Sequence, residues 1–571
     1  MPKFALQFIQ NITSQGSIFA YLIILPICVL NTLPFLALLF PLSKTQKRII
    51  LITVIGIDTA LIVVSASLTH QLIYNMGYDT WMHLTIIQRG IENGLFAGDP
   101  YYPNFPTTPH YSIADVFYML LSKITGIAPH LLWGNLSFIF AGLIFLACIW
   151  WYKELFEDSR FGWLAGLLFI LSISIKWHYA TYPRNIAFIF FFLSLLFYFR
   201  SAKKRYILYC GISFGFCIMS HLFTGIMCFT FLIAYIILTW GIDAIHRKKR
   251  LWIEELKRLA FIPIGCIVAS PWLFIFGKQA LTHTETSMSH YSLPDWHAET
   301  TILGWTFTIY KPKMFFEIFP KILWILAGIG FLICLYYIIR GNYKPVHIFL
   351  VSSAIIPVLV LLTPLYLPIV HVFGEWMPPR FIRVMSVPPL AVLSCGTIVY
   401  FLTMIRANHK IQRSIIRSFG IILAFIFIII VISPIAIMQK NLYKSNEQVL
   451  TPLDTWESDF SALKGTIKDK VVLTDPNTSY FLTYYTSAYV VAIPPGHGSP
   501  YINHEARNAD VSTIFDLNTN SEKRYELLNK YQVEYIMLNL RSIPNTAKEI
   551  FDQQKRFKLV YDVNGLIVYK Y

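Results

Sequence analysis

The stretch Phe223-Thr-Gly-Ile-Met-Cys-Phe-Thr-Phe-Leu-Ile-Ala-Tyr-Ile-Ile-Leu-Thr-Trp240 contains no charged side chain. About 20 apolar residues in a helix cross the roughly 30 Å hydrocarbon core of a membrane. The chain has about twelve runs of this kind, which predicts a polytopic α-helical membrane protein. Their limits are Ser17 to Pro41, Arg48 to Leu68, Leu131 to Trp151, Phe161 to Ile175, Asn185 to Phe199, Tyr206 to Ser220, Phe223 to Trp240, Leu259 to Phe276, Ile322 to Ile339, His347 to Leu367, Phe381 to Met404 and Ile415 to Ser433.

The composition excludes an ordinary soluble enzyme. Of the 571 residues, 56% are hydrophobic and 14% charged, against about 45–50% and 25% in soluble domains. The net charge of +16 does not indicate a nucleic-acid partner, because the Lys and Arg residues form short clusters between apolar runs. The first run lacks the basic start and cleavage site of a signal peptide, so we expect it to remain as a span.

Every second loop between the spans is basic, and the positive-inside rule makes those loops cytoplasmic. Both termini are then predicted to be extracytoplasmic. The basic loops carry Lys44, Lys47 and Arg48; Lys153 and Arg160; Arg200 and Lys203 to Arg205; Arg247 to Arg250, Lys257 and Arg258; Arg340 and Lys344; and Arg406, Lys410, Arg413 and Arg417.

The sequence predicts two domains. Residues 1–438 form the transmembrane domain, with outer loops at 69–130 and 277–321. Residues 439–571 lose the long apolar runs and alternate short strand-like segments with helical ones, which is typical of a small extracytoplasmic α/β domain. The expected segments are 470–474, 489–493, 522–531 (helical), 535–539, 559–563 and 565–569.

The eight cysteines all fall within predicted spans. A disulfide framework and a zinc site are therefore not expected, since the metal-ligand spacings of Cys and His are also missing. The sequence has no Walker motif or other phosphate-cradling Gly-rich loop, which argues against an ATP-driven pump.

The first outer loop contains the first catalytic candidates. In Asn75-Met-Gly-Tyr-Asp-Thr-Trp-Met-His83, a helix beginning after Gly77 places Asp79 and His83 on one face, four residues apart. An acid at this position is suited to accept a proton from an incoming hydroxyl or to help hold a divalent cation. An interfacial acid paired with a histidine is the alternative.

Asp99 is the second candidate acid, in Gly98-Asp-Pro-Tyr-Tyr-Pro103. An Asp that starts a turn before Pro100 is the structural alternative. Downstream, the amphipathic stretch from Tyr111 to Lys123 is suited to lie in the membrane interface.

Outer arginines are candidates for binding the phosphate of a lipid-linked donor, because guanidinium binds phosphate through a planar fork. Arg184, Arg380 and Arg383 lie on the predicted outer side, against the positive-inside bias, although snorkelling also explains such positions. The residues His178, His221 and Glu375 are candidates for lining the same cavity, and helix-end hydrogen bonding is the alternative for the two histidines. Asp58 lies inside the second span, where an acid is costly and therefore a functional candidate.

The second outer loop is rich in His and acids, from Thr282 through Glu299, but has no regular ligand spacing. It is interpreted as a mobile lid.

The ensemble resembles the GT-C superfamily of integral-membrane glycosyltransferases, which use polyprenyl-phosphate-linked sugars on the outer face of the membrane. The resemblance covers nearly the whole chain. It is carried by Gly77-Tyr-Asp79, Gly98-Asp-Pro-Tyr-Tyr-Pro103, Tyr182-Pro-Arg184, Ser220-His-Leu-Phe-Thr-Gly225, Pro379-Arg-Phe-Ile-Arg383 and the outward α/β tail, in which Val471-Val-Leu-Thr-Asp-Pro476 and Tyr535-Ile-Met-Leu538 resemble poorly described prokaryotic members.

By position, the resemblance makes Asp79 the catalytic base or metal-associated acid, with Asp99 as a second candidate for that role. It also implies that the three outer arginines bind the donor phosphate. It implies an inverting transfer to a protein, lipid or glycan acceptor in a prokaryotic plasma membrane, with a divalent cation (Mg²⁺ or Mn²⁺) as an optional cofactor. The Asp-Glu pair of protein mannosyltransferases and the Trp-Trp-Asp segment of oligosaccharyltransferases are both missing, so neither acceptor carries over.

Two other classes fit the span count. A transporter or lipid flippase would use Asp58 and the outer arginines as a path, but such folds often consist of two related halves, and no internal repeat is visible. A non-catalytic cell-envelope assembly protein with the same fold is the third reading. The sequence does not specify the sugar, the acceptor, the prenyl chain or the oligomeric state.

Overall fold

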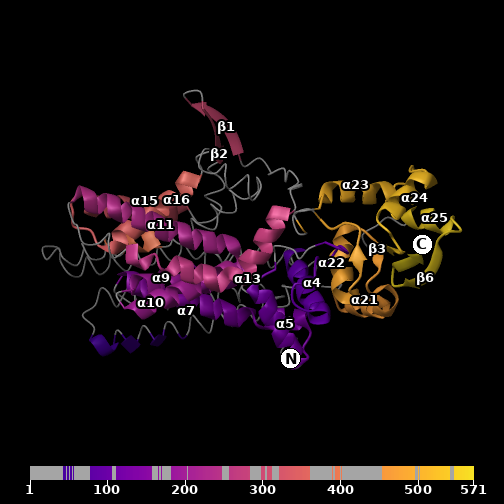
Figure 1. Cartoon of the computed structure of the whole chain (residues 1–571), viewed down its shortest axis with the longest axis horizontal. Helices are drawn as coiled ribbons and strands as arrows, with labels where there is room; N and C mark the ends of the chain where they lie inside the picture. Colours follow the sequence, from indigo (N-terminus) through magenta and orange to yellow (C-terminus); the bar gives the residue numbers. More distant parts are fainter. Residues whose placement is uncertain are drawn as a thin grey trace, which may run out of the picture. The chain divides into compact units, whose positions relative to one another are not determined.

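The computed structural model is rich in helices (Figure 1). It describes residues 78–105, 111–156, 182–246, 256–282, 297–310, 321–360, 453–494, 502–540 and 546–571, with short gaps, together with scattered positions in 43–56, 162–169, 389–400 and residue 499. The described residues fall into two compact units. We call them the helical unit, from the ranges 1–70, 136–270 and 293–445, and the mixed unit, from 71–135, 271–292 and 446–571.

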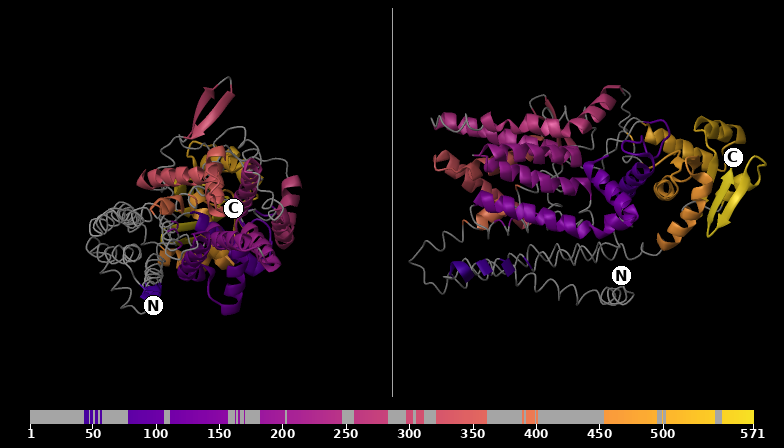
Figure 2. Two further views of the ribbon diagram at one scale, coloured as in Figure 1. Left: turned by 90° about the vertical axis from the view of Figure 1, so that its left-hand side faces the viewer. Right: turned by 60° about the horizontal axis from the view of Figure 1, so that its bottom comes forward.

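Long apolar helices make up the helical unit, and several run side by side along their length (Figure 2). Their residues are mostly apolar, which favours burial or a lipid environment. Helix α9 begins with Pro183 in its first turn, where proline costs no hydrogen bond. These helices are α7 (Ser137–Phe156), α9 (Pro183–Phe199), α10 (Lys204–Ser220), α11 (Leu222–Ile245), α13 (Phe261–Thr282), α15 (Lys321–Ile339) and α16 (Pro345–Val360). The residues of α13 from Pro271 onward belong to the mixed unit.

These helices agree with seven of the predicted spans in position, although several ends differ by about five residues and one predicted span is broken. The run from Leu131 to Trp151 was expected as one helix, but α6 (Pro129–Asn135) ends before α7 begins at Ser137. Gly134 and Asn135 are weak helix formers, which explains the break.

Two described helices are long and apolar enough to cross a membrane, Leu222–Ile245 and Leu256–Ile275. Shorter apolar helices cover Pro183–Phe199, Leu323–Ile339 and Pro345–Ile356. The remaining predicted spans lie wholly or mostly outside the described residues, so the total of about twelve stays a prediction.

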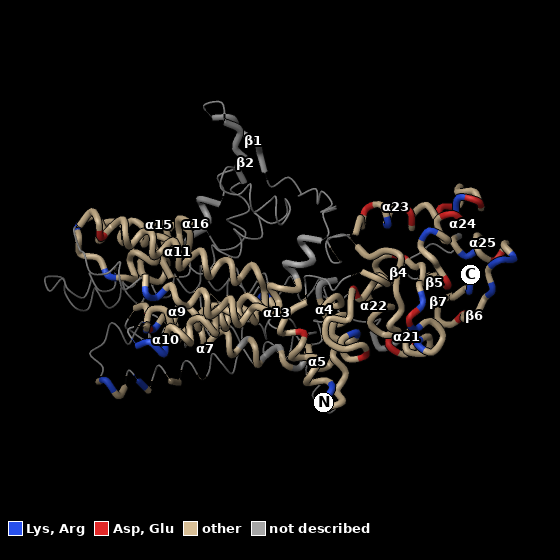
Figure 3. The backbone as a smooth tube through the Cα atoms, in the orientation of Figure 1, with Lys and Arg blue, Asp and Glu red and all other residues tan. Residues whose placement is uncertain are grey.

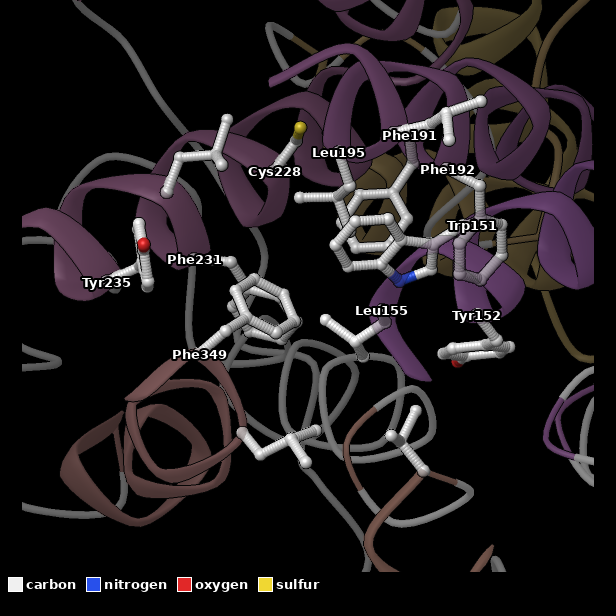
Figure 4. Close-up of a cluster of buried hydrophobic side chains, with 14 of the residues drawn as sticks. Trp151, Tyr152, Leu155, Phe191, Phe192, Leu195, Cys228, Phe231, Tyr235 and Phe349 are labelled. Atoms are coloured by element: carbon white, nitrogen blue, oxygen red, sulfur yellow. The ribbon is translucent and has the colours of Figure 1, made fainter. Parts of the chain in front are cut away.

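Aromatic rings fill the core of the helical unit (Figure 4). Trp151 of α7 lies 5.4 Å from Phe349 of α16, and Phe199 of α9 lies 5.0 Å from Trp151. Phe231 of α11 is fully buried in the same cluster. The Trp151–Phe349 and Phe231–Phe349 contacts are edge-to-face, an arrangement that stabilises beyond the burial of apolar area. Four helices are therefore joined by one continuous set of rings.

Helices α10 and α13 approach closely through glycines spaced four residues apart. A Cβ atom on Gly211 would lie 2.6 Å from Ile264, and one on Gly215 would lie 2.6 Å from Val268. On the facing helix, a Cβ atom on Gly265 would meet the Phe214 ring. Small residues at this spacing let apolar helices pack backbone to backbone.

Gly215→Ala is expected to lower the melting temperature, because the added methyl group would collide with Val268 and with the Gly265 carbonyl oxygen at 2.9 Å. Overpacking of this kind costs about 1–3 kcal/mol. The matched control is Gly241→Ala in α11, where a Cβ atom meets nothing within 4 Å; removing a helical glycine there should stabilise. Equal upward shifts for both variants in thermal unfolding would contradict the close packing.

Most of the Lys and Arg residues that Figure 3 shows in blue on the helical unit gather at one end of its helices. Arg200, which caps the C-terminus of α9, pairs with Glu154 near the end of α7. Arg258 lies 5.8 Å above the Tyr198 ring, also at the end of α9. Arg184, at the start of α9, and His221, after the end of α10, therefore lie at the opposite ends of their helices.

The mixed unit combines the first outer loop with the tail. Its loop part contains α4 (Tyr78–Asn93), α5 (Ile113–Thr125) and α6. Its tail part has a five-stranded sheet in the order β4-β3-β5-β7-β6, in which β4, β3 and β5 are parallel and β7 is antiparallel to both neighbours. The strands are β3 (Val471–Leu473), β4 (Tyr489–Val490), β5 (Tyr535–Asn539), β6 (Lys558–Val563) and β7 (Leu566–Lys570).

Helices surround this sheet, and the predicted segments of the tail coincide with its strands and with α24, although β4 is only two residues long. The helices are α21 (Leu453–Ile467), α22 (Pro476–Thr486), α23 (His504–Phe515), α24 (Ser521–Lys530) and α25 (Thr546–Asp552). Ile536 and Leu538 of β5 are fully buried in the hydrophobic core between this sheet and its helices. The predicted division of the chain at residues 438 and 439 stays a prediction, while the contacts group residues 71–135 with the tail.

The second outer loop contains an antiparallel hairpin, β1 (His297–Ile302) and β2 (Trp305–Tyr310). In β2, Thr306 and Thr308 alternate with apolar residues, a pattern that favours extended backbone. The acids and histidines from His283 to Asp295 lie outside the described residues, and the interpretation as a lid stays a prediction.

Candidate functional site

Helix α4 carries the first catalytic candidates. It begins at Tyr78, directly after Gly77, as the sequence predicts, so Asp79 lies in its first turn and His83 one turn further. A carboxylate is stabilised in the first turn by the helix dipole and the unpaired N–H groups. The backbone therefore places Asp79 and His83 on one face of α4; the side chain of Asp79 is outside the described part of the structure.

His83 forms a buried pair with Asp115 of α5. Its Nδ1 lies 3.0 Å from Asp115 Oδ1, and both side chains are almost completely buried. The imidazole also stacks on the indole of Trp133, with ring centroids 5.7 Å apart. A carboxylate facing Nδ1 favours the tautomer with its proton on that nitrogen, so Asp115 orients the ring and directs Nε2 to the other side.

Asp115 is itself held by the start of α5. Its Oδ2 accepts hydrogen bonds from both the backbone N–H and the hydroxyl of Ser112, each at 2.8 Å, and the Ser112 hydroxyl accepts one from the Asp115 N–H. This reciprocal arrangement is a capping box. Sequence reasoning missed Asp115. The signal for it is the pattern Ser-x-x-Asp at the start of the amphipathic stretch, which forms helix α5.

Asp99 closes a turn in the first outer loop. Its Oδ1 accepts hydrogen bonds from the N–H groups of Tyr101 and Tyr102 at 2.8 and 3.1 Å, while its own N–H donates to the Phe105 carbonyl. These contacts correspond to the structural alternative for this residue, and its catalytic role stays a prediction. Burial raises the pKa of Asp99 to about 7, against the opposing effect of the backbone N–H groups and of Arg507.

Asp99→Asn is expected to flatten the pH dependence of stability. Because the pKa of Asp99 is raised to about 7 in the folded state, folding favours the protonated form, and stability is lost as the pH rises through that value. Asparagine keeps the oxygen that accepts the turn hydrogen bonds but has no charge. Melting temperatures measured from pH 5 to 8 should therefore fall less steeply in the variant.

Asp562→Asn is the control for this measurement, because Asp562 is half-exposed and pairs with Lys548 on the surface. It should leave the pH profile unchanged. Parallel profiles for Asp99→Asn and the natural protein would show that the Asp99 carboxyl titrates normally.

Arg184 and His221 belong to the helical unit. Arg184 follows Pro183 in the first turn of α9 and is partly buried. His221 caps α11: its Nδ1 lies 2.9 Å from the Thr224 hydroxyl and accepts a hydrogen bond from the Thr224 N–H at 3.3 Å. The helix-end role considered for His221 is thus present, and the cavity role stays a prediction.

The other predicted site residues, Asp58, His178, Glu375, Arg380 and Arg383, lie outside the described residues. Among the described side chains, no three His, Cys, Asp or Glu residues come together in a way that could hold a metal ion. Since Asp79 is not among those side chains, the divalent cation stays a prediction.

No protein-family model matches the sequence, and no curated protein does. Solved structures do match. The Archaeoglobus fulgidus oligosaccharyltransferase AglB, in complex with an inhibitory peptide and a dolichol-phosphate, is 12% identical with a TM-score of 0.55; the match covers 90% of this chain and 74% of that one.

ArnT from Cupriavidus metallidurans, bound to undecaprenyl phosphate, is 11% identical with a TM-score of 0.50, covering 90% of this chain and 97% of ArnT. The mycobacterial arabinofuranosyltransferase AftD is 12% identical with a TM-score of 0.52, covering 89% and 39%. At these identities the likeness is one of fold. The resemblance predicted from the sequence is confirmed at that level: the chain has the fold of the GT-C glycosyltransferases.

Proposed function

We propose that this chain is an integral-membrane glycosyltransferase that transfers a sugar from a polyprenyl-phosphate-linked donor to an acceptor on the outer face of the membrane. The observation that carries the proposal is the GT-C fold over 90% of the chain, joined to a first-loop helix with Asp79 in its first turn. Two of the matching enzymes were solved with a polyprenyl phosphate bound, which supports a donor of that class.

The proposed reaction is a direct displacement at the anomeric carbon. Asp79 takes the proton from the acceptor hydroxyl, whose oxygen forms the new bond to the anomeric carbon. The bond from that carbon to the phosphate oxygen breaks, and the polyprenyl phosphate leaves with the electron pair. One base suffices, and the configuration inverts; a retaining reaction would need a second carboxylate as nucleophile.

The leaving phosphate needs positive partners, because its charge grows in the transition state. We assign this role to Arg184, Arg380 and Arg383, and we assign His178, His221 and Glu375 to the walls of the donor cavity. If Asp79 instead has the metal-associated role, a divalent cation that it holds would supply charge neutralisation on the phosphate.

His83 is proposed to assist Asp79 from the next turn of α4. The Asp115 carboxylate holds its ring in place from α5, and a ring fixed in this way needs little reorganisation when the acceptor binds. Asp115 is therefore a positioning residue, since it acts through His83.

The basic ends of the helices in the helical unit support a cytoplasmic location for that end. The first outer loop, the tail and both termini are then extracytoplasmic. We propose a prokaryotic plasma membrane as the location, with a protein, lipid or glycan as acceptor.

The experiment that tests this function supplies a panel of radiolabelled polyprenyl-phosphate hexoses and pentoses to membranes that contain the protein and to membranes from cells without it. We expect label from one donor class to enter a glycan, lipid or protein fraction only when the protein is present. Movement of lipid or solute across the membrane, with no transfer from any donor, would instead establish the transporter or flippase reading.

A further inference from the structure

Arg89 is an almost completely buried cation in the mixed unit, three turns along α4 from Asp79. Its side chain is 5% exposed. Nη1 donates a hydrogen bond to Asp469 Oδ1 at 2.7 Å, and the guanidinium carbon lies 4.3 Å from the centre of the Tyr489 ring. Asp469 is 54% exposed, so its charge is largely screened by water and compensates the buried cation only in part.

The remaining N–H groups of this guanidinium differ from Nη1. Nε and Nη2 are both buried and have no hydrogen-bond partner among the described residues. Buried donors normally have a protein or water partner, because a donor that is buried without one loses the hydrogen bonds it made to water in the unfolded chain. The Nε and Nη2 pair is also one of the two edges through which arginine binds an oxyanion with two parallel hydrogen bonds.

Arg89 lines a small pocket in the mixed unit. Small residues dominate the described part of its wall, and no acidic side chain is among them. The wall consists of Ile86, Arg89, Gly90, Gly94, Ala97, Gly98, Pro100 and Tyr111. Gly94 and Gly98 both have φ near 92°, a conformation that residues with side chains rarely adopt, so the backbone keeps this wall free of side chains.

We propose that this pocket binds a small oxyanion, a phosphate or carboxylate group, through the Nε–H and Nη2–H groups of Arg89. The pocket is too small for a whole lipid-linked sugar, so the proposed ligand is a single anionic group. Asp79 and Arg89 are ten residues apart on one helix, which is about 15 Å along its axis. The site is therefore separate from the proposed point of transfer, and it does not depend on the proposed function.

The test measures the melting temperature of the purified full chain as inorganic phosphate is added at constant ionic strength. A ligand that binds only the folded state stabilises it by mass action, and we expect a rise of about 2–4 °C. Arg89→Met should abolish this rise. Arg556→Met is the matched control, because Arg556 also lies over a tyrosine ring, 4.4 Å from Tyr525, but is exposed; its rise should equal that of the natural protein.

Ala97→Asp tests the same site without touching the arginine, in case Arg89→Met fails to fold. Ala97 is an exposed residue of the pocket wall, so the variant should fold and its added negative charge should weaken phosphate binding. Equal phosphate effects in the natural protein and in either pocket variant would overturn the proposal.

A parallel titration with glucuronate distinguishes the two sources of the anion. A rise with phosphate alone identifies a phosphate-bearing ligand, and a rise with glucuronate alone identifies an acidic sugar. No rise with either anion would overturn the site. Because the readout is thermal stability, this result is independent of whether sugar transfer is detected.

Discussion

Asp79→Asn is expected to reduce sugar transfer by about 10²- to 10⁴-fold, the usual contribution of a positioned general base. Asparagine has nearly the same shape as aspartate but cannot accept the proton of the acceptor hydroxyl. The fold should tolerate it, because asparagine is also accepted near the start of a helix, where residue 79 lies. Initial rates of transfer at saturating donor, in membranes matched for protein content, measure the effect.

Asp115→Asn provides the contrast with a positioning residue. It keeps an oxygen near His83 but removes the charge that orients the ring, so we expect a smaller loss of rate together with a changed pH profile. Asp562→Asn, on the surface, should have no effect on transfer. Full activity in a folded Asp79→Asn protein would rule out Asp79 as the base.

Trp81→Ala is expected to destabilise the mixed unit by about 3–5 kcal/mol, the usual cost of truncating a buried aromatic side chain. Trp81 is 1% exposed. Its ring lies 4.7 Å from that of Phe481, 5.4 Å from Tyr484 and 5.9 Å from Tyr485, all on α22. Because Trp81 follows Asp79 by two residues, this variant should also reduce transfer.

Thermal unfolding and protease resistance of the purified protein measure the loss, and Trp81→Phe should restore part of it. Trp150→Ala is the matched control, because Trp150 is 45% exposed and its removal should cost much less. If the two tryptophan variants had the same melting temperature, the aromatic packing between α4 and α22 would not contribute to stability.

Local patterns explain why much of the fold could be predicted from the sequence. The apolar runs correspond to helices such as α11 and α15, and the alternating segments of the tail correspond to β3, β5, β6 and β7. Each of these signals is contained in a window of fewer than about 20 residues, the range over which hydrophobic periodicity acts. The break between α6 and α7 was missed because apolarity is continuous there and only Gly134 and Asn135 weaken the helix.

The candidate site was less predictable, because its contacts join residues far apart in the chain. The helix that carries Asp79 and His83 was predicted from Gly77 and the spacing, but the partner of His83 lies 32 residues away. The partner of Arg89 lies 380 residues away. Hydrophobic periodicity is a local signal and does not indicate such distant pairs. The burial of Asp99 likewise depends on tertiary packing.

The hydrogen bond from the Val490 N–H to the Tyr101 carbonyl oxygen, 2.9 Å long, bears on biosynthesis. Val490 belongs to β4, the edge strand of the sheet, and Tyr101 covers part of that edge from the first outer loop. At about 5–20 residues per second, a ribosome would synthesise β4 roughly 20–80 s after Tyr101. During that interval the nascent first loop lacks its partner for this hydrogen bond, so the contact between the loop and the edge of the sheet forms only after most of the chain has been synthesised.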